Sequence, residues 1–209
     1  MLESLPFLLL LRGEQDSSRC NACLTLQGRA KPKIANYPFT TIIPNLGVWI
    51  PGAGPEEDGP LLKGSGSDGL VMCDVPGLIA GAARGVGLGH AFLRHVERCR
   101  VIVHLVDATS NDPIADYAML NQEILQYGTE LAKKPQVVVV NKVDVYETDQ
   151  SGPEWETGLE LRFTKEELES RLIGVMPHTR LMWMSAKDRS GVDDLMQRLA
   201  AFVKKVKET

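Results

Sequence analysis

The sequence predicts an α/β fold in which a doubly wound, mostly parallel sheet carries helices on both faces. Apolar runs with the character of strands alternate along the chain with segments of helical periodicity, an order typical of parallel sheets. Four consecutive valines, Val137–Val140, are typical of a central strand that is buried on both faces. Polar groups fall in loops and directly after predicted strands, where such sheets bind ligands.

The composition fits an ordinary globular chain with one core. The 209 residues suffice for one sizeable core, and 44% of them are hydrophobic. The 23 basic and 27 acidic residues give a formal charge of −4. This balance argues against a dedicated nucleic-acid-binding surface, and we find no dedicated DNA-binding motif.

The cysteine pattern favours an intracellular, reducing compartment, without separating a cytoplasmic from an organellar location. The four cysteines, at positions 20, 23, 73 and 99, do not form the framework of a secreted disulfide-rich protein. Cys20 and Cys23 have the spacing of a redox motif or of half a zinc site, but no second pair follows. A metal or redox role for them is therefore disfavoured.

The first part of the chain, residues 1–29, is predicted to be an atypical amino-terminal segment. Its apolar run Leu5–Leu11 is too short to span a bilayer and lacks the flanks of a secretory signal. We expect either a buried strand or a disordered apolar end. Prolines at 32, 38 and 44 then favour a long loop. The hydroxyls of Thr40 and Thr41 in this loop suit either a magnesium ion or a backbone turn.

Two short strands follow, Leu46–Ile50 and Leu70–Asp74, joined by an insertion rich in Gly and Pro that we expect to form a hairpin connection. The insertion contains a literal G-x-G-x-x-G, Gly64–Gly69. A dinucleotide site requires this motif to follow a strand and open a helix, whereas here it precedes a strand, so we reject that function.

Asp74 ends the second of these strands, and Gly77 comes three residues later. A strand-end aspartate can hold a magnesium ion, as in P-loop NTPases, and a glycine can bring its backbone N–H close to a ligand. After a glycine-rich stretch, His90–Arg98 has the pattern of an amphipathic helix. The spacing of its two histidines does not suit a helical metal pair.

The rest of the chain continues the alternation of strands and helices. A capping box, Thr164–Glu167, opens one helix that is expected to end near Gly174. An acidic, glycine-containing stretch before it is predicted to be an insertion. The remaining predicted elements are a strand at Val101–Asp107, helical periodicity over Asp112–Leu131, a strand at Thr179–Met184, and a closing helix with an apolar stripe from Val192 to Val206.

Asn141, Lys142 and Asp144 directly follow the four valines and can read a purine base. The carboxylate of Asp144 can accept two hydrogen bonds from N1–H and the exocyclic amine of guanine, a donor pair that adenine does not offer on that edge. Asn141 can bond the base or brace the loop, and the aliphatic stem of Lys142 can cover the ring. Taken alone, the pattern is equally consistent with a strand and a polar turn.

Ser185, Ala186 and Lys187 complete a series of motifs in the order required of a guanine-nucleotide-binding domain. Their conjunction is more specific than any one of them. The chain resembles the Obg family of GTPases, from about Ala30 to Lys205. The segments that carry the resemblance are Ala30–Gly47, Asp74–Ala82 and Gly85–Arg98.

The resemblance implies a P-loop GTPase-like G domain, residues 30–209, that binds GTP or GDP with Mg²⁺ and is linked to ribosome assembly, with the ribosomal particle as a partner. It implies magnesium ligation by Thr41 and Asp74, with Gly77 sensing the γ-phosphate. Base recognition falls to Asn141, Lys142 and Asp144, with Ser185, Ala186 and Lys187 closing over the base. Leu78, after Gly77, cannot orient water as the glutamine of Ras-type enzymes does.

The amino end departs from the family pattern. No G-x-x-x-x-G-K-[ST] precedes Ala30, where only Gly13 and Gly28 are glycines and no lysine occurs. The glycine-rich amino-terminal domain of the family is also missing, and Ala80 stands where the family pattern has an acid. Two functions therefore follow as hypotheses: an Obg-type GTPase, whose turnover without a phosphate loop is in question, and a non-catalytic G-domain remnant or interaction module.

Overall fold

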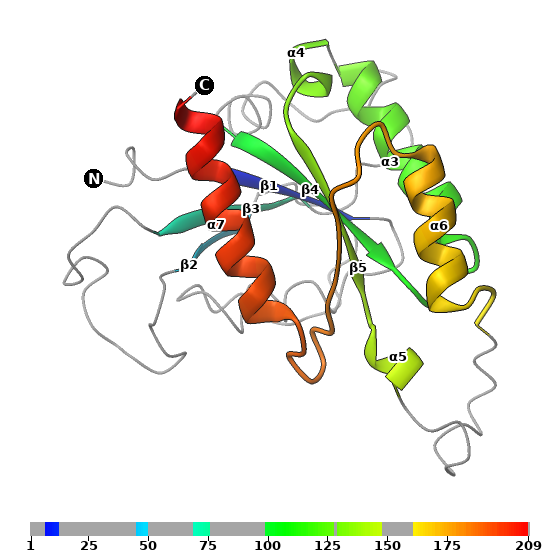
Figure 1. Ribbon diagram of the computed structural model, residues 1–209. Coiled ribbons are helices and arrows are strands. Elements are labelled where there is room, and N and C mark those ends of the chain that lie inside the picture. The colour runs from blue at the N-terminus through cyan, green and yellow to red at the C-terminus, as the bar shows by residue number, and fades with distance from the viewer. Residues whose placement is uncertain are drawn as a thin grey trace.

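A computed structural model describes residues 7–12, 45–49, 69–75, 99–127, 129–147 and 161–208. These residues form an α/β fold, shown in Figure 1. Thr40, Thr41, Gly77, Leu78 and the predicted helix His90–Arg98 lie outside the described residues. The elements are β1 (Phe7–Arg12), β2 (Asn45–Trp49), β3 (Leu70–Val75), β4 (Cys99–Asp107), α3 (Pro113–Tyr127), α4 (Thr129–Ala132), β5 (Gln136–Asn141), α5 (Asp144–Glu147), α6 (Lys165–Val175), β6 (Leu181–Trp183) and α7 (Val192–Glu208).

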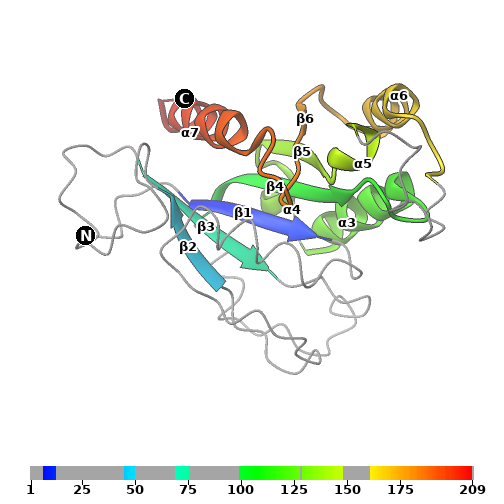
Figure 2. The same cartoon turned by 90° about the horizontal axis from the view of Figure 1, so that it is seen from below.

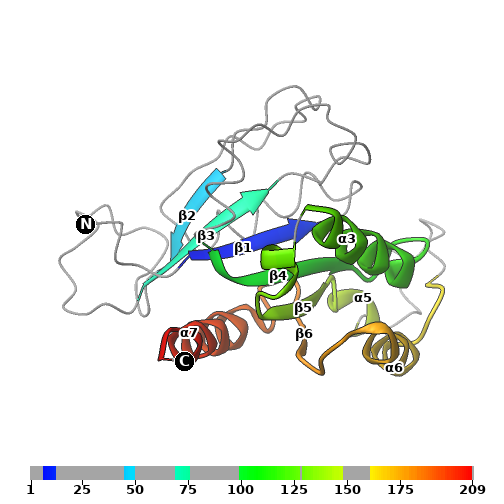
Figure 3. The same ribbon diagram turned by 90° about the horizontal axis from the view of Figure 1, so that it is seen from above.

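The strands form one six-stranded sheet in the order β2-β3-β1-β4-β5-β6. Figure 3 shows this order running from β2 at the top to β6 at the bottom. Only the β2–β3 pair is antiparallel, as a hairpin requires, while the predicted connection between these two strands lies outside the described residues. All other neighbouring strands are parallel. The predicted mostly parallel sheet is therefore confirmed.

The apolar amino-terminal run forms β1, which lies between β3 and β4. Of the two predictions for this run, the strand is thus confirmed. The strand order reverses at β1, since β3 and β2 follow on one side and β4, β5 and β6 on the other. Ligands of doubly wound sheets bind at the carboxyl ends of the strands near such a reversal.

The four valines of β5 alternate between two cores on opposite faces of the sheet. Val137 and Val139 pack in the cluster that contains the buried residues of α7. Val138 and Val140 pack in a second cluster with Tyr117 of α3 and residues of α6. In Figures 1 and 2, α7 lies on one side and α3 and α6 on the other. The central strand buried on both faces is confirmed.

The helices follow the sequence signals closely. At the start of α6, Thr164 Oγ1 accepts from the Glu167 backbone N–H at 3.2 Å, and a Glu167 carboxylate oxygen accepts from the Thr164 N–H at 3.1 Å, so the capping box is confirmed. The periodic stretch Asp112–Leu131 forms two helices, α3 and α4, rather than one. None of the described helices is both long and apolar enough for a bilayer crossing.

The turn before α7 requires a glycine. Gly191 has φ +71°, and a Cβ added there would lie 2.6 Å from the Trp183 carbonyl oxygen. We expect Gly191→Ala to lower the free energy of unfolding by roughly 2 kcal/mol, because the alanine adds backbone strain and a backbone contact that must be relieved. Urea denaturation measures the loss.

Gly174 in α6 provides the matched control, since a Cβ added there meets no atom within 4 Å. Gly174→Ala should raise stability by up to about 1 kcal/mol, because alanine is the better helix former. If both substitutions changed the stability alike, the turn at Gly191 would not depend on glycine.

Candidate functional site

Three chain segments meet at the carboxyl ends of β4, β5 and β6. Asp107 is the register partner of Asn141 across the parallel β4–β5 pair. The backbone N–H of Ala108 donates to the Asn141 carbonyl at 3.1 Å, and the N–H of Val143 donates to the Met184 carbonyl at 3.1 Å. The loops after all three strands are therefore fixed to one another by backbone hydrogen bonds.

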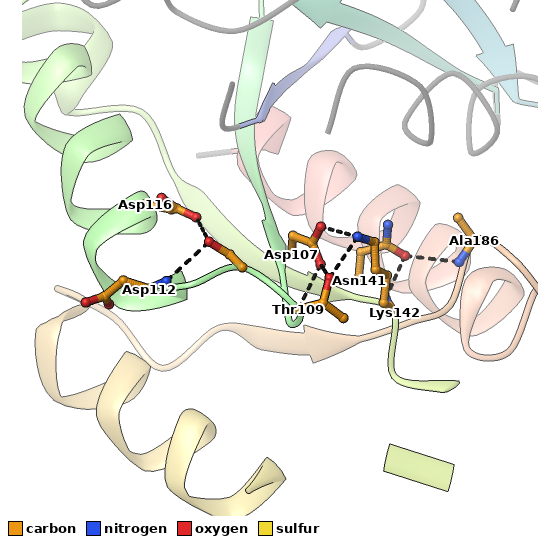
Figure 4. Close-up of polar contacts among 8 residues, drawn as sticks. Asp107, Thr109, Asp112, Asp116, Asn141, Lys142 and Ala186 are labelled. Atoms are coloured by element: carbon orange, nitrogen blue, oxygen red, sulfur yellow. Dashed lines mark hydrogen bonds and ion pairs between the residues drawn. The ribbon is translucent and has the colours of Figure 1, made fainter. Parts of the chain in front are cut away.

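Asn141 joins the loop after β5 to the loop after β6. Its side chain is buried, and its Oδ1 accepts from the backbone N–H of Lys142 at 2.8 Å and of Ala186 at 3.0 Å. Figure 4 shows this amide between the two loops. Asn141 thus braces the loop, one of the two roles predicted for it.

The other end of the same amide is unsatisfied. Within the described part of the chain, Asn141 Nδ2 is buried and has no hydrogen-bond partner. A buried donor left in this state costs about 1–3 kcal/mol. A ligand acceptor placed beside it would remove that cost, so bracing the loop and bonding a ligand are compatible roles for this side chain.

Lys142 adopts a left-handed backbone conformation, with φ 72°. This conformation costs a non-glycine residue of order 1–3 kcal/mol and persists only where the surroundings enforce it. The Lys142 Nζ forms an ion pair with the Asp107 carboxylate and donates to Thr109 Oγ1 at 3.0 Å. The ammonium is therefore anchored to the loop after β4, while cover of a base by the lysine stem stays a prediction.

Asp144 begins α5, two residues beyond Lys142 in the chain. Its side chain is mostly buried, at 17% exposure, and its Oδ2 lies 4.0 Å from the Nζ of Lys187. The Lys187 side chain is 78% exposed, so solvent weakens this ion pair and it contributes little to stability. The structure therefore brings together Asp144 and Lys187, which the sequence predicts to lie at one site.

Ser185 shapes the turn that carries Ala186 and Lys187. Its side chain is fully buried, and its Oγ accepts from the backbone N–H of Lys187 at 3.2 Å and of Asp188 at 3.4 Å. Its own N–H donates to the Ser190 carbonyl at 2.9 Å. The serine thus stabilises a tight turn, and the turn delivers the Ala186 N–H to Asn141.

The residues predicted to bind magnesium and the γ-phosphate are not tested by the structure and stay predictions. Asp74 lies in β3 as expected, with its backbone described and its side chain not, while Thr41 and Gly77 fall outside the described residues. Over the described ranges, no three His, Cys, Asp or Glu side chains gather in a way that suits a metal ion.

Asp107 and Thr109 have no role predicted from the sequence, and the structure places them beside Asn141 and Lys142. Asp107 Oδ1 accepts from the Thr109 backbone N–H at 2.8 Å and from its hydroxyl at 2.7 Å, while Oδ2 faces Lys142. A signal was present, because Asp107 ends a buried strand just as Asp74 does. Its position beside Asn141 depends on strand pairing.

Comparison with known proteins identifies related sequences. The family described as 50S ribosome-binding GTPase matches residues 17–142. The chain is 44% identical over 170 residues to GTPase Obg of Crocosphaera subtropica, covering 81% of this chain and 42% of that protein. It is 42% identical over 176 residues to GTPase Obg of Cyanothece sp., covering 84% and 41%. The chain spans about two fifths of the length of these curated relatives.

A solved structure shows the same fold. The crystal structure of Era in complex with MgGDPNP and nucleotides 1506–1542 of 16S ribosomal RNA is similar, with a TM-score of 0.56 and 19% sequence identity. The likeness covers 94% of this chain and 57% of that one. It supports the G-domain fold of the present chain.

Proposed function

The chain belongs to the 50S ribosome-binding GTPase family and is of the Obg type, and from this we propose that its carboxyl-end site binds the base of a guanine nucleotide. The observation that carries the proposal is the buried, unpartnered Nδ2 of Asn141 in the loop that also holds Asp144. Guanine presents acceptors at N7 and O6, and donors at N1 and its exocyclic amine.

The chemistry of the site matches that base edge. The Asp144 carboxylate accepts from the two guanine donors, and Asn141 Nδ2 donates to the guanine acceptor N7. Adenine lacks the paired donors, so it leaves the carboxylate unmatched. Lys187 lies near Asp144 and covers the base from the solvent side.

Other residues are proposed to bind the triphosphate and its magnesium ion. GTP or GDP is the proposed ligand, with Thr41 and Asp74 holding Mg²⁺ and Gly77 donating to the γ-phosphate. The 209 residues contain no G-x-x-x-x-G-K-[ST], so we propose base recognition with weak phosphate binding and negligible hydrolysis. A bound magnesium ion would neutralise phosphate charge.

The family description supports a partner and the cysteines support a location. Because the matched family is that of 50S ribosome-binding GTPases, a ribosomal particle is the proposed partner. Cys73 and Cys99 are buried and form no disulfide, which supports the proposed reducing, intracellular compartment.

Substitution of Asp144 tests base recognition. Asp144→Asn exchanges one carboxylate oxygen for an amide donor, so the site should favour xanthine, which carries an acceptor where guanine carries the amine. We expect the ratio of guanosine to xanthosine affinity to fall at least about tenfold, the effect of one hydrogen bond of about 1.4 kcal/mol. Competition titrations with the two nucleosides measure it.

Asp188→Asn is the matched control. Asp188 lies in the neighbouring turn, is exposed, and its Oδ1 accepts from the Ser190 N–H at 2.9 Å, which an asparagine oxygen can still do. This variant should keep the guanine preference. An equal loss of affinity for both nucleosides in Asp144→Asn would argue against the base assignment.

A further inference from the structure

The strained backbone at Lys142 connects the two side chains proposed to read the base. Among the described non-glycine residues, Lys142 and Arg189 have positive φ. Asn141 precedes Lys142 directly and Asp144 follows two residues later, so the conformation at Lys142 sets how the two side chains stand relative to each other. Whatever holds Lys142 therefore also holds the geometry of base recognition.

Lys142 is held by a closed set of contacts with the loop after β4. The Asp107 carboxylate pairs with the ammonium through Oδ2 and with Thr109 through Oδ1. The Thr109 hydroxyl donates to that carboxylate and accepts from the ammonium at 3.0 Å. Figure 4 shows the three side chains joined in this way, and we call them the lysine clamp.

Solvent has little access to the lysine clamp. The side chains of Lys142 and Asp107 are each 14% exposed, so their attraction is screened far less than that of a surface pair. Asp107 also lies beside Asn141 in the sheet register. The clamp thus adjoins the base-reading amide in two ways, through the β4–β5 strand pair and through the Lys142 backbone N–H, which donates to Asn141 Oδ1.

We propose that Asp107 and Thr109 are positioning residues that, through Lys142, set Asn141 and Asp144 in place for the guanine base. This proposal rests on the proposed function. Neither residue touches the base, and both act by fixing Lys142. Because the Lys142 ammonium is committed to Asp107, the effect of the clamp concerns the base and not the phosphates.

Substitution of Asp107 by asparagine opens the clamp with little change in size. If the new amide nitrogen faces Lys142, it places a donor against the ammonium. If it faces Thr109, it places a donor against the Thr109 backbone N–H, from which Asp107 Oδ1 accepts a hydrogen bond in the unaltered chain. In both orientations one contact is lost. Thr109→Val is a second, milder variant that removes the hydroxyl and keeps the shape.

The readout is the preference for guanosine over 7-deazaguanosine, which lacks the N7 acceptor for Asn141 Nδ2. We expect the unaltered chain to prefer guanosine about tenfold, and Asp107→Asn and Thr109→Val to reduce this to under about threefold. Ser110→Ala is the matched control, because the Ser110 hydroxyl contacts Asp116 and lies outside the clamp. Loss of overall stability alone would weaken both nucleosides equally.

A second measurement uses the ligand-free chain. Hydrogen exchange of the Lys142 and Ala186 backbone amides, both bonded to Asn141 Oδ1, should quicken at least about tenfold in Asp107→Asn and stay unchanged in Ser110→Ala. If Asp107→Asn and Thr109→Val both keep the preference for guanosine over 7-deazaguanosine, the positioning role of the clamp is overturned and the proposed function stands. Failure of the unaltered chain to bind guanosine would overturn the proposed function, and unchanged exchange would then overturn the clamp as well.

Discussion

The 209-residue chain should bind GTP with a dissociation constant on the order of 0.1 mM or weaker and hydrolyse it negligibly. Most of the charge of the ligand lies in its triphosphate, and the sequence lacks the loop whose backbone N–H groups, lysine and hydroxyl would receive it. Three charge-assisted hydrogen bonds of about 2 kcal/mol each correspond to roughly four orders of magnitude in affinity.

The structure adds a reason for weak phosphate binding. Lys142, a cation at the site, is already paired with Asp107. Lys187 is 78% exposed, so its charge is screened and its side chain is not preorganised for a phosphate. The base-reading groups can therefore confer specificity while adding little affinity for the charged part of the ligand.

Fluorescence titration with a labelled GTP, with and without magnesium, measures this binding. Guanosine provides the comparison, and its affinity should lie within about threefold of that of GTP, because the phosphates gain few contacts. Sub-micromolar, magnesium-dependent binding would contradict the expectation. It would mean that residues outside the described part of the chain build a phosphate site of another design.

The elements that were predicted correctly are those whose signals are local. The capping box of α6 involves residues three apart, and the alternating burial of the β5 valines follows from their uninterrupted run. The Leu5–Leu11 run was undecided between strand and disordered end, because its partners β3 and β4 lie far along the chain. Non-local pairing decides such segments, and apolar composition alone does not.

In the candidate site too, features with a local sequence signal could be predicted, and features that depend on non-local contacts could not. Asn141 and Asp144 follow a recognisable strand, so their place at its carboxyl end could be predicted. The role of Asp107 could not, because it depends on the register that sets it beside Asn141. The left-handed conformation of Lys142 was equally hidden, since lysine has no preference for it and it persists only where tertiary contacts enforce it.

Acid should destabilise the fold through His104, well above the pH at which carboxylates titrate. His104 lies fully buried in β4, its Nε2 3.0 Å from Gln136 Oε1 and its ring edge-on to Tyr117, with centroids 5.2 Å apart. Burial lowers the pKa of His104 from 6.5 to about 4, against a smaller raising effect of the Gln136 hydrogen bond. Within the described residues Nδ1 has no partner, so a proton added there would be unpaired.

The sign of the pH dependence follows from this depressed pKa. The unfolded chain takes up the proton near pH 6.5 and the folded chain only near pH 4, so the stabilisation is complete above pH 6.5 and is lost as the pH falls towards 4. The whole interval corresponds to about 3 kcal/mol, of which about 2 kcal/mol is lost between about pH 7 and pH 5.

Urea denaturation at a series of pH values measures the slope, at low protein concentration because the sequence pI is about 5.6. His104→Gln cannot titrate, so its stability should change less between pH 7 and pH 5 than that of the unaltered chain, whatever its absolute value. His178→Gln is the control, because burial also lowers the pKa of His178, but that side chain remains partly exposed and should contribute a smaller slope.

If His104→Gln does not fold, the ring signals of His104 in the unaltered chain decide the same point. They should show no protonation by NMR until the pH falls well below 6. Titration of His104 near its ordinary pKa would mean that water reaches the ring between β4 and α3. The acid sensitivity would then have to come from other groups, because a histidine that titrates alike in both states contributes no pH-dependent stability.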